Sequence, residues 1–487
     1  MQRPDPRHLP AVLLCATAAT ARLLVGPHVV DDAYITMRYS RNLSSMSAMS
    51  YNPPDAVLGT SSPLWTWIMA AGAAAGAAPE TTAVATAWLA DMGSIVLLMT
   101  SPAAGSLAVL ASAATIAGWP AYVAYSVSGL ETSLYVLLVT GFVASLSRGQ
   151  ATVSAAAASL GALCRPDGAL LVILGFAWTG LMQSRAAALR FLATATAICA
   201  PWVIYASVRF GSFVPASVSA KASASDPWFL SLQNLQAYFL QGLYLPLTML
   251  AMVGFVVLLR SGGAFWRVWS IWGWSYLVAM TAANGFTHFP WYFVPLLPIY
   301  TAAAAGGARH LALWGEGAWH LSRKGAWHRW HESRARVALS ADWRRALTAA
   351  ALGAALLTRI PALTASLDAA AAGRERLYAA VATELAAVDA HCIVAATEIG
   401  TIGYYYPGRV LDLVGLVSPE VIGRPVDAVL AESGARWLVT YDTHFDRAAA
   451  QSPRFSGLYE RRRIVPVAHT RVLEIYERRG PVGCRTS

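Results

Sequence analysis

The chain has 487 residues, of which 56% are hydrophobic and only 13% are charged, and its mean hydropathy is +0.47. A soluble globular protein carries roughly a quarter charged residues and a disordered chain has low hydrophobicity, so both classes are excluded. The net charge is +10, but only Lys221 and Lys324 are lysines. The excess of arginine is interpreted as a marker of membrane topology and not as a surface for nucleic-acid binding. The chain is predicted to cross a membrane many times.

The first apolar run, from Leu9 to Val25, follows Arg3 and Arg7. It lacks a convincing cleavage site of small residues, so it is predicted to be a membrane crossing and not a signal peptide. One crossing takes about 20 helical residues. Further runs of this kind lie at residues 83–101, 105–121, 131–147, 151–164, 168–184, 190–210, 239–260, 267–284, 291–308 and 346–363. About eleven transmembrane helices are therefore predicted, with residues 62–79 crossing only partly or re-entering.

Basic residues between these runs predict the sides of the membrane. Residues 309–345 hold eight lysines and arginines, and such loops stay in the cytoplasm under the positive-inside rule. Counting forward from an N-terminus on the inside places the first outer loop, residues 28–61, outside. This count agrees with the count back from the cytoplasmic basic loop only if residues 62–79 do not cross fully. The basic loop is interpreted as a solvated loop that sets topology, although its stretch from Trp314 to Trp343 also suits anionic lipid of the inner leaflet.

The last crossing then leads outward, so the chain divides into a transmembrane domain at 1–363 and an extracytoplasmic domain at 364–487. The second part is expected to be a small α/β domain. Helices are predicted from Arg374 to Val388 and from Val426 to Ser433, and strands in the apolar runs 392–400, 409–417, 435–442 and 471–479. The five cysteines show no metal-ligand spacing, and only Cys392 and Cys484 are candidates for a disulfide, which requires an oxidising compartment.

Asp31 and Asp32 follow the first apolar run after a short segment, residues 26–30. Adjacent carboxylates at the end of an apolar helix are poorly solvated and repel each other, which raises the pKa of one of them and suits a general base. The same pair also suits a divalent cation such as Mg²⁺, Mn²⁺ or Ca²⁺. A helix cap is an equally good explanation from the residues alone, because Asp before a helix accepts its first N–H groups.

Several segments in order resemble a bacterial family of the glycosyltransferase C superfamily that includes the mycobacterial terminal arabinofuranosyltransferase of cell-wall arabinan. The resemblance is carried by DDAYITMRYSRNL, YNP and TSSPLWT in the first outer loop, then SGLETSLY (128–135), LCRPDGALL (163–171), PWVIYASVRFGSFVPASVSAK (201–221), HFPWYFVPLLP (288–298) and EIGTIGYYYPGRVLDLVGLVSPE (398–420). It implies a helix bundle of the glycosyltransferase C type in the bacterial inner membrane, with its active site on the outer face.

The resemblance also implies the reaction and its residues. A monosaccharide, with arabinofuranose a candidate, is expected to move from a polyprenyl-phosphate donor to a cell-envelope glycan or glycolipid. Asp31 matches the position of the catalytic base, and Asp32 is the second choice. A divalent cation, if one is needed, is expected on this pair. The residues expected to bind substrate are Tyr34, Arg38, Asn52, Glu131, Arg165, Asp167, Lys221, His288, Trp291 and Tyr292.

Simpler roles stay open for several of these residues. Glu131 also suits a helix N-terminus, and Arg165 and Asp167 also suit an ion pair that fixes a turn. Lys221 fits donor phosphate or a plain interfacial position, and the aromatic pair after His288 fits an aromatic belt at the membrane interface. Rival functions are a lipid or glycan transporter, which would place ionisable groups near the bilayer midplane, and a transferase acting on protein hydroxyls or on lipid A.

Overall fold

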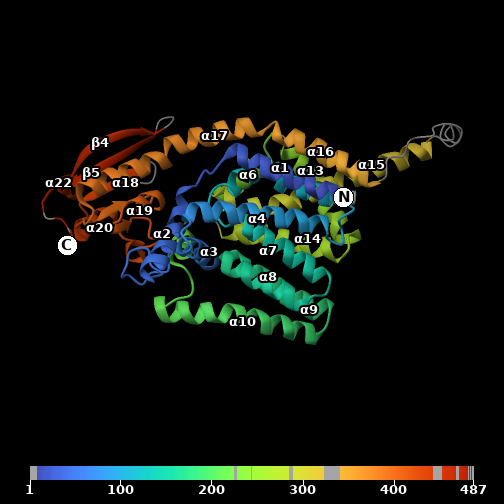
Figure 1. The fold of residues 1–487 in the computed structure, drawn as a ribbon, viewed down its shortest axis with the longest axis horizontal. Coiled ribbons are helices and arrows are strands. Elements are labelled where there is room, and N and C mark those ends of the chain that lie inside the picture. The colour runs from blue at the N-terminus through green and yellow to red at the C-terminus, as the bar shows by residue number, and fades with distance from the viewer. Residues whose placement is uncertain are drawn as a thin grey trace.

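The computed structural model describes residues 8–223, 228–242, 244–283, 289–322, 341–441, 452–467, 471–480, 482 and 484. The described chain is mainly helical, and its helices form an elongated bundle with a small sheet-containing domain at one end (Figure 1). The helices of the bundle are α1 (Leu9–Val25), α4 (Pro79–Met99), α5 (Leu107–Gly118), α6 (Pro120–Ser126), α7 (Thr132–Ser147), α8 (Ala151–Cys164), α9 (Ala169–Met182), α10 (Arg185–Phe210), α13 (Tyr244–Ser261), α14 (Ala264–Ala282), α15 (Leu297–Ser322), α16 (Ala341–Leu357) and α17 (Ile360–Gly373).

Four stretches are helical, long and apolar enough to cross a membrane: Pro79–Met99, Arg185–Phe210, Tyr244–Ser261 and Arg344–Asp368. The pair α5 and α6 passes the same test together, although it bends by 52° at its break. Several other apolar helices, such as α1 and α7, are shorter than 18 residues. A multi-pass membrane protein is therefore supported, while the count of eleven crossings stays a prediction. Helix α3 (Pro63–Ala74), within the segment expected to cross only partly, has twelve residues.

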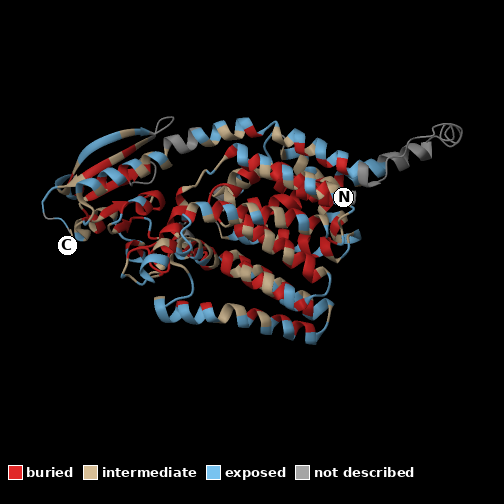
Figure 2. Ribbon diagram, viewed as in Figure 1, coloured by how far each residue is buried: buried red, intermediate tan, exposed pale blue. Residues whose placement is uncertain are grey.

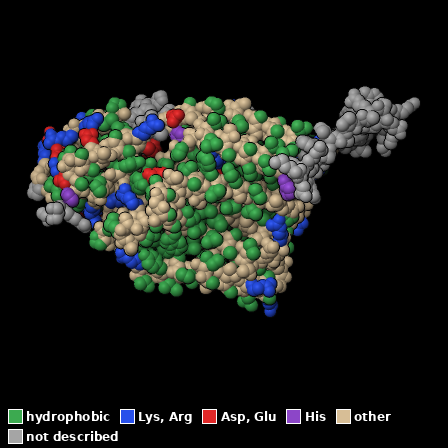
Figure 3. Space-filling model, in the orientation of Figure 1, with side chains coloured by type: hydrophobic (Ala, Val, Ile, Leu, Met, Phe, Trp, Pro, Cys, Tyr) green, Lys and Arg blue, Asp and Glu red, His purple; other side chains and the backbone are tan. Residues whose placement is uncertain are grey.

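Buried side chains fill the centre of the bundle, while α10 presents mostly exposed residues along its length (Figure 2). Leu189, Ile204 and Val208 of α10 are all more than 60% exposed, and water would solvate such apolar side chains poorly. Their exposure is explained if this side of the bundle faces lipid tails. Figure 3 shows the corresponding broad apolar surface between the two more highly charged ends of the molecule.

A buried ion pair stabilises the bend between α5 and α6. Pro120 has no N–H group, so the carbonyl of Ile116 loses its helical partner. Arg22 of α1 donates to this oxygen at 2.8 Å and to the carbonyl oxygen of Ala117 at 3.0 Å. Its guanidinium also pairs with Asp91 of α4 at 2.7 Å, with both side chains fully buried. One arginine thus satisfies both the free carbonyl groups and the buried carboxylate.

The segment predicted as the first outer loop begins with the 16-residue helix α2 (Asp31–Met46). This helix lies between the bundle and the C-terminal domain (residues 364–487), which we call the outer domain after its predicted side of the membrane (Figure 1). It packs against α3 and against α19 (Gly400–Tyr405). Two further helices, α11 (Ala216–Ser223) and α12 (Trp228–Phe239), follow α10. The polar segment around the acidic pair is therefore held on a rigid element, in contact with both parts of the chain.

The outer domain contains a five-stranded sheet in the order β2-β1-β3-β5-β4. The strands are β1 (Val394–Ala396), β2 (Val410–Asp412), β3 (Trp437–Tyr441), β4 (Tyr459–Val467) and β5 (Arg471–Arg478). Strands β2, β1 and β3 are parallel, while β5 pairs antiparallel with both β3 and β4. Helices α18 (Glu375–Asp389), α20 (Val426–Ser433) and α22 (Pro453–Leu458) complete the domain. Cys392 and Cys484 form a disulfide that ties the end of the chain to the start of β1.

The predicted elements of this domain are confirmed in part. The helix predicted at 426–433 is present with those bounds, and α18 begins and ends one residue later than predicted. The strand predicted over 392–400 is wrong after Ala396, because Gly400 begins helix α19. The strand predicted over 409–417 ends at Asp412, whose carboxylate caps a turn that includes Gly415 at φ +93°. Strand β4 was not predicted, because its consecutive arginines interrupt the alternation of apolar and polar residues that is typical of a strand.

Candidate active site

The carboxylate of Asp31 is buried at the junction of α2 and the outer domain. Its Oδ2 accepts the backbone N–H of Gly400 at 2.9 Å, and its Oδ1 accepts that of Thr401 at 2.7 Å. Only 3% of the residue is exposed. A Cβ atom at position 400 would overlap the main-chain oxygen of Asp31, so this close approach requires glycine. Asp31 therefore fixes α19 against the start of the first outer loop.

The pKa of Asp31 is raised to about 7, mainly by burial and secondly by the nearby charge of Glu398. The N–H of Thr401 opposes this shift, while Asp32 adds a smaller increase in the same direction. The sequence predicted a raised pKa for one member of the acidic pair. The structure attributes it mainly to loss of water, with charge repulsion second.

Asp32 lies on another face of α2 and is only partly buried. Consecutive helical residues point about 100° apart, and residues four apart share a face. Thr36, one turn after Asp32, has its Oγ1 3.4 Å from the Oγ1 of Thr60. The adjacent carboxylates thus diverge: Asp31 contacts the outer domain, whereas Asp32 lies on the face towards the polar segment of Thr60 and Ser62.

Arg38 and Asn52 join the first outer loop to the outer domain. Arg38 is 3% exposed, and its guanidinium donates to the carbonyl oxygens of Tyr51 at 2.7 Å and Gly408 at 2.8 Å, among others. The Nδ2 of Asn52 donates to the carbonyl of Val410 at 2.8 Å, and its Oδ1 accepts the N–H of the same residue at 3.1 Å. Asn52 thereby pairs with the free edge of β2. The sequence analysis assigned substrate binding to both residues, and the structure places both in this interface.

Tyr34 belongs to an aromatic cluster at the same interface. Its ring centroid lies 5.0 Å from that of Tyr404 and 5.8 Å from that of Tyr405. Arg41 donates to the carbonyl oxygen of Tyr404 at 2.7 Å and lies over its ring. Burial raises the pKa of the Tyr34 hydroxyl above its ordinary value. The aromatic residues after the acidic pair therefore contact one another across the two domains.

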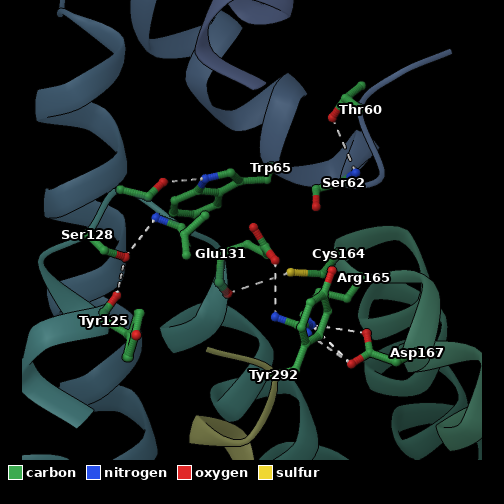
Figure 4. A network of polar contacts seen from close by, with 12 residues as sticks. Thr60, Ser62, Trp65, Tyr125, Ser128, Glu131, Cys164, Arg165, Asp167 and Tyr292 are labelled. Carbon is green, nitrogen blue, oxygen red and sulfur yellow. Dashed lines mark hydrogen bonds and ion pairs between the residues drawn. The ribbon is translucent and has the colours of Figure 1, made fainter. Parts of the chain in front are cut away.

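A second group of charged side chains lies at the ends of α7 and α8, and we call Glu131, Arg165 and Asp167 the acid–arginine cluster (Figure 4). The Nε of Arg165 is 3.0 Å from an oxygen of Asp167, and its Nη1 is 3.2 Å from Glu131. The side chain of Glu131 is 13% exposed, against 2% for Arg165 and 6% for Asp167. The ion pair considered for Arg165 and Asp167 is present, and the predicted Glu131 joins it.

Two tyrosines complete the acid–arginine cluster. The guanidinium of Arg165 lies 4.8 Å from the ring centroid of Tyr292, in the short helix η3 (Pro290–Tyr292). The hydroxyl of Tyr276, from α14, is 2.6 Å from Asp167 and 2.8 Å from the main-chain oxygen of Tyr292. The sequence analysis missed Tyr276 because it lies within an apolar run, where nothing distinguishes it from a core aromatic residue.

Trp65 and Gly129 connect the first outer loop to the acid–arginine cluster. The indole Nε1 of Trp65 in α3 donates to the carbonyl oxygen of Gly129 at 3.0 Å. Gly129 has φ +80°, and a Cβ there would lie within 3.2 Å of Met37 and Ala33 of α2. The turn before Glu131 is thus packed directly on α2. Figure 4 shows Thr60, Ser62 and Trp65 above Glu131, with Arg165 and Asp167 below it.

The remaining predicted site residues are only partly described. Trp291 packs 4.8 Å from Phe289 and 6.2 Å from Tyr125, measured between ring centroids. Lys221 lies in α11, but its side chain is outside the described part of the structure, and His288 is outside the described residues. Of the described residues, the one group of three or more with metal-binding geometry comprises Asp389 and the two disulfide-bonded cysteines, so a cation at the acidic pair stays an expectation.

An apolar cavity of about 200 Å³ lies between α12, α13, α14 and α15. Its lining includes Phe239, Met252, Trp274 and Leu277. Phe239 also contacts Phe293, with ring centroids 5.9 Å apart, and Phe293 directly follows Tyr292. An aromatic line formed by Phe239, Phe293 and its chain neighbour Tyr292 therefore runs from this cavity to the acid–arginine cluster.

The comparison with solved structures shows that this chain shares its fold with two membrane proteins, ArnT and AglB. ArnT from Cupriavidus metallidurans, solved bound to undecaprenyl phosphate, matches with a TM-score of 0.58 at 15% identity, covering 95% of this chain and 97% of that chain. The Archaeoglobus fulgidus oligosaccharyltransferase AglB, solved with an inhibitory peptide and a dolichol-phosphate, matches with a TM-score of 0.55 at 12% identity, covering 88% of this chain and 69% of that chain.

Other comparisons are less informative. The arabinofuranosyltransferase AftD from Mycobacteria matches with a TM-score of 0.44 at 16% identity, covering 97% of this chain and 40% of that chain, and we draw nothing from this weaker likeness. A family model described as a domain of unknown function, DUF8728, matches residues 369–478, which lie within the outer domain. No curated protein matches in sequence.

Proposed function

We propose that this protein is a membrane glycosyltransferase that moves a monosaccharide from a polyprenyl-phosphate donor to a hydroxyl group of a cell-envelope glycan or glycolipid. The observation that carries the proposal is that α2, which bears the acidic pair, packs against the turn before Glu131 of the acid–arginine cluster, within a fold shared with ArnT and AglB. The neighbours' bound undecaprenyl phosphate and dolichol-phosphate support a polyprenyl carrier for the donor. Arabinofuranose is one candidate sugar.

Within the acidic pair, we assign the general base to Asp32. A base must approach the acceptor hydroxyl to within about 3 Å. Asp31 is almost fully buried, and each of its carboxylate oxygens already accepts a backbone N–H. Asp32 is more accessible and lies on the helix face that leads to Thr60. Asp31, the first choice from the sequence, then acts as a positioning residue that holds α2 against the outer domain.

In the proposed reaction, the acceptor oxygen attacks the anomeric carbon of the donor sugar. The bond between that carbon and the phosphate oxygen breaks, polyprenyl phosphate leaves with the electron pair, and the acceptor proton passes to Asp32. The acid–arginine cluster brings together two carboxylates and one guanidinium, so acidic groups outnumber basic groups among these three residues and leave an excess of negative charge. That charge suits sugar hydroxyls better than phosphate, so we assign Glu131 to sugar binding and Arg165 to its orientation. Lys221 is the proposed phosphate contact, because negative charge develops on the leaving group.

The polyprenyl chain is proposed to occupy the apolar cavity between α12 and α15. Its lining is apolar apart from the hydroxyls of Thr248 and Tyr300, which bond to each other at 2.7 Å. Apolar chain burial in such a cavity is favourable, and the aromatic line through Phe293 links it to the acid–arginine cluster. A donor bound in this way would have its sugar near Glu131 and its isoprene units in the bundle.

The proposal is tested with the purified full chain in nanodiscs and a panel of radiolabelled polyprenyl-phosphate monosaccharides, arabinofuranose included, with a cell-envelope extract as acceptor. We expect one donor to yield a labelled glycan together with free polyprenyl phosphate. Protein hydroxyls and lipid A serve as alternative acceptors in parallel reactions. Movement of labelled lipid across the bilayer without any transfer product would instead identify a transporter.

A further inference from the structure

Three tyrosines and two opposite charges meet where α19 ends, at its junction with α2 and the start of α4. Tyr404 donates its hydroxyl to the Oε2 of Glu80, in the first turn of α4, at 3.2 Å. Arg41 of α2 donates to the main-chain oxygen of Tyr404 at 2.7 Å and lies 4.8 Å from the centroid of its ring. Together with Tyr34 and Tyr405, which pack on the same ring, these residues form a group that we call the tyrosine site.

Tyr405 is the exposed member of the tyrosine site. It is 41% exposed, whereas Tyr34 and Tyr404 are each 9% exposed. Its ring centroid lies 5.3 Å from that of Tyr404, with the ring planes 88° apart, and 5.8 Å from that of Tyr34. The two buried rings therefore fix the orientation of the third and leave part of it open. A ring that is ordered before binding loses little conformational entropy when a ligand covers it.

Glu80 and Arg41 keep hydrogen-bonding capacity beside the tyrosines, and both residues are partly exposed. A carboxylate has several acceptor positions, and a guanidinium has several donors. Within the described residues, the contact of Glu80 with the Tyr404 hydroxyl and that of Arg41 with the Tyr404 main chain are the only hydrogen bonds of these two side chains. Both therefore retain hydrogen-bonding groups for a ligand that covers Tyr405.

This combination matches the chemistry of a neutral sugar. A sugar ring has a face of C–H groups, which packs on an aromatic ring, and hydroxyl groups at its rim that both donate and accept. Glu80 suits the hydroxyl protons, and Arg41 suits the sugar oxygens. Because the acid and the arginine offset each other's charge, a charged ligand group gains little there. A lipid tail is a poor match, since it has no hydrogen-bonding groups to offer.

The tyrosine site is linked to the acidic pair through α19. Asp31 accepts the N–H of Gly400 at the start of this helix, and Tyr405 is its last residue. Five residues of α-helix span about 8 Å. A saccharide chain that covers Tyr405 can therefore extend towards the start of α2 with a neighbouring sugar unit.

We propose that the tyrosine site binds a neutral sugar unit of the acceptor glycan, with the sugar ring on Tyr405 and its hydroxyls on Glu80 and Arg41. The description of this sugar as part of the acceptor rests on the proposed transfer reaction, whereas saccharide binding itself is measurable without a donor. The site then selects the acceptor at a distance from the bond that forms.

The test measures saccharide binding by the full chain in nanodiscs. The probe is the pool of neutral oligosaccharides released by mild acid from a bacterial cell-envelope extract and labelled with a fluorophore, and fluorescence polarisation follows its binding. We expect Tyr405→Ala and Glu80→Gln each to weaken binding about tenfold, since the first removes a ring contact and the second a charged hydrogen bond. Tyr405→Phe keeps the ring and should bind nearly as the wild type does.

Matched controls lie outside the tyrosine site. Phe213→Ala removes another exposed aromatic ring, and Glu384→Gln removes an exposed acid that pairs with Arg463. Both should bind the probe as the wild type does. The anionic oligosaccharides of the same extract should bind more weakly than the neutral pool.

Absence of binding of the neutral pool by the wild type would overturn the proposal. So would equal binding by wild type, Tyr405→Ala and Glu80→Gln, or equal losses in the site and control variants. A lower thermal midpoint for Tyr405→Ala with unchanged binding would overturn it too, and would identify a ring that anchors the protein at the membrane interface. Saccharide binding without transfer from any donor would refute the proposed function and leave the tyrosine site supported.

Discussion

The Oδ1 of Asp31 lies 2.7 Å from the backbone nitrogen of Thr401, a residue 370 positions later in the chain. This contact joins the first outer loop to the outer domain through a buried carboxylate. Its consequence is that α2, and with it Asp32, depends on the outer domain for its position. The domain boundary drawn from composition near residue 364 therefore does not separate two independent functional units.

Asp31→Asn should loosen this junction. The amide keeps one acceptor oxygen but turns its NH₂ group towards a backbone N–H, so one buried donor loses its partner at a cost of about 1–3 kcal/mol. We expect a lower thermal midpoint and faster proteolysis between the domains, with transfer reduced but measurable. Asp32→Asn is the matched control, which should leave the free energy of unfolding within about 0.5 kcal/mol of the wild type. Equal stability of the two variants would contradict the positioning role of Asp31.

Stability should fall as pH rises from about 4 to about 7. An unfolded aspartate titrates near 3.9, whereas burial raises the pKa of Asp31 to about 7 and that of Asp412 to about 6. Between these values the folded protein binds more protons than the unfolded chain, so unfolding becomes easier with increasing pH and the effect levels off above about 7. Thermal midpoints in detergent from pH 4 to 8 measure this slope. Asp31→Asn should make it shallower, and an unchanged slope would exclude Asp31 as its source.

Asp91→Leu should destabilise the bundle strongly. It leaves the fully buried Arg22 without its carboxylate, and breaking a buried pair in this way costs about 3–5 kcal/mol. Arg22→Lys keeps the charge but not the fork of donors that reaches Asp91 and the carbonyl of Ile116, so it should also destabilise. The control is Ser94→Ala, one turn along α4, whose hydroxyl bonds only to a carbonyl of its own helix. Thermal unfolding in detergent should give a clearly higher midpoint for Ser94→Ala than for Asp91→Leu or Arg22→Lys.

Glu131→Gln should weaken donor binding. The variant keeps the shape of the side chain but removes the charge proposed to hold sugar hydroxyls, worth about tenfold to a hundredfold in KM for a charged hydrogen bond. Asp55→Asn removes an acid that pairs with Arg409 outside the acid–arginine cluster, so this control variant should retain the wild-type KM. Steady-state transfer with varied donor separates KM from kcat. A variant that lowers kcat alone would place Glu131 in the chemical step instead.

The sequence predicted the elements with a strong local pattern. The apolar runs predicted the bundle helices, and the amphipathic pattern before Asp389 predicted both ends of α18 to within one residue. The predicted topology also placed Glu131, Arg165 and Asp167 on the same side of the membrane, because an even number of crossings separates their loops. The structure adds that they contact one another directly.

Other features depend on contacts that a local pattern does not contain. Asp31 and Asp32 are adjacent, so only the register of α2 against α19 distinguishes the one that is buried. Asp91 and Tyr276 lie within apolar runs, where a single polar group looks like an ordinary substitution until its partner is known. Helix α19 begins in a segment whose apolar composition resembles a strand, and its start at Gly400 is fixed by the approach of Asp31.

The most direct test of the account is single-turnover transfer from the labelled polyprenyl-phosphate sugar that the donor panel identifies. Wild type, Asp32→Asn and Asp31→Asn are compared at saturating donor and acceptor. The account predicts a loss of about 10²-fold or more for Asp32→Asn with an intact fold, and a smaller loss for Asp31→Asn that follows its lower stability. Turnover by Asp32→Asn close to wild type, with Asp31→Asn inactive and fully folded, would contradict it and return the base to Asp31.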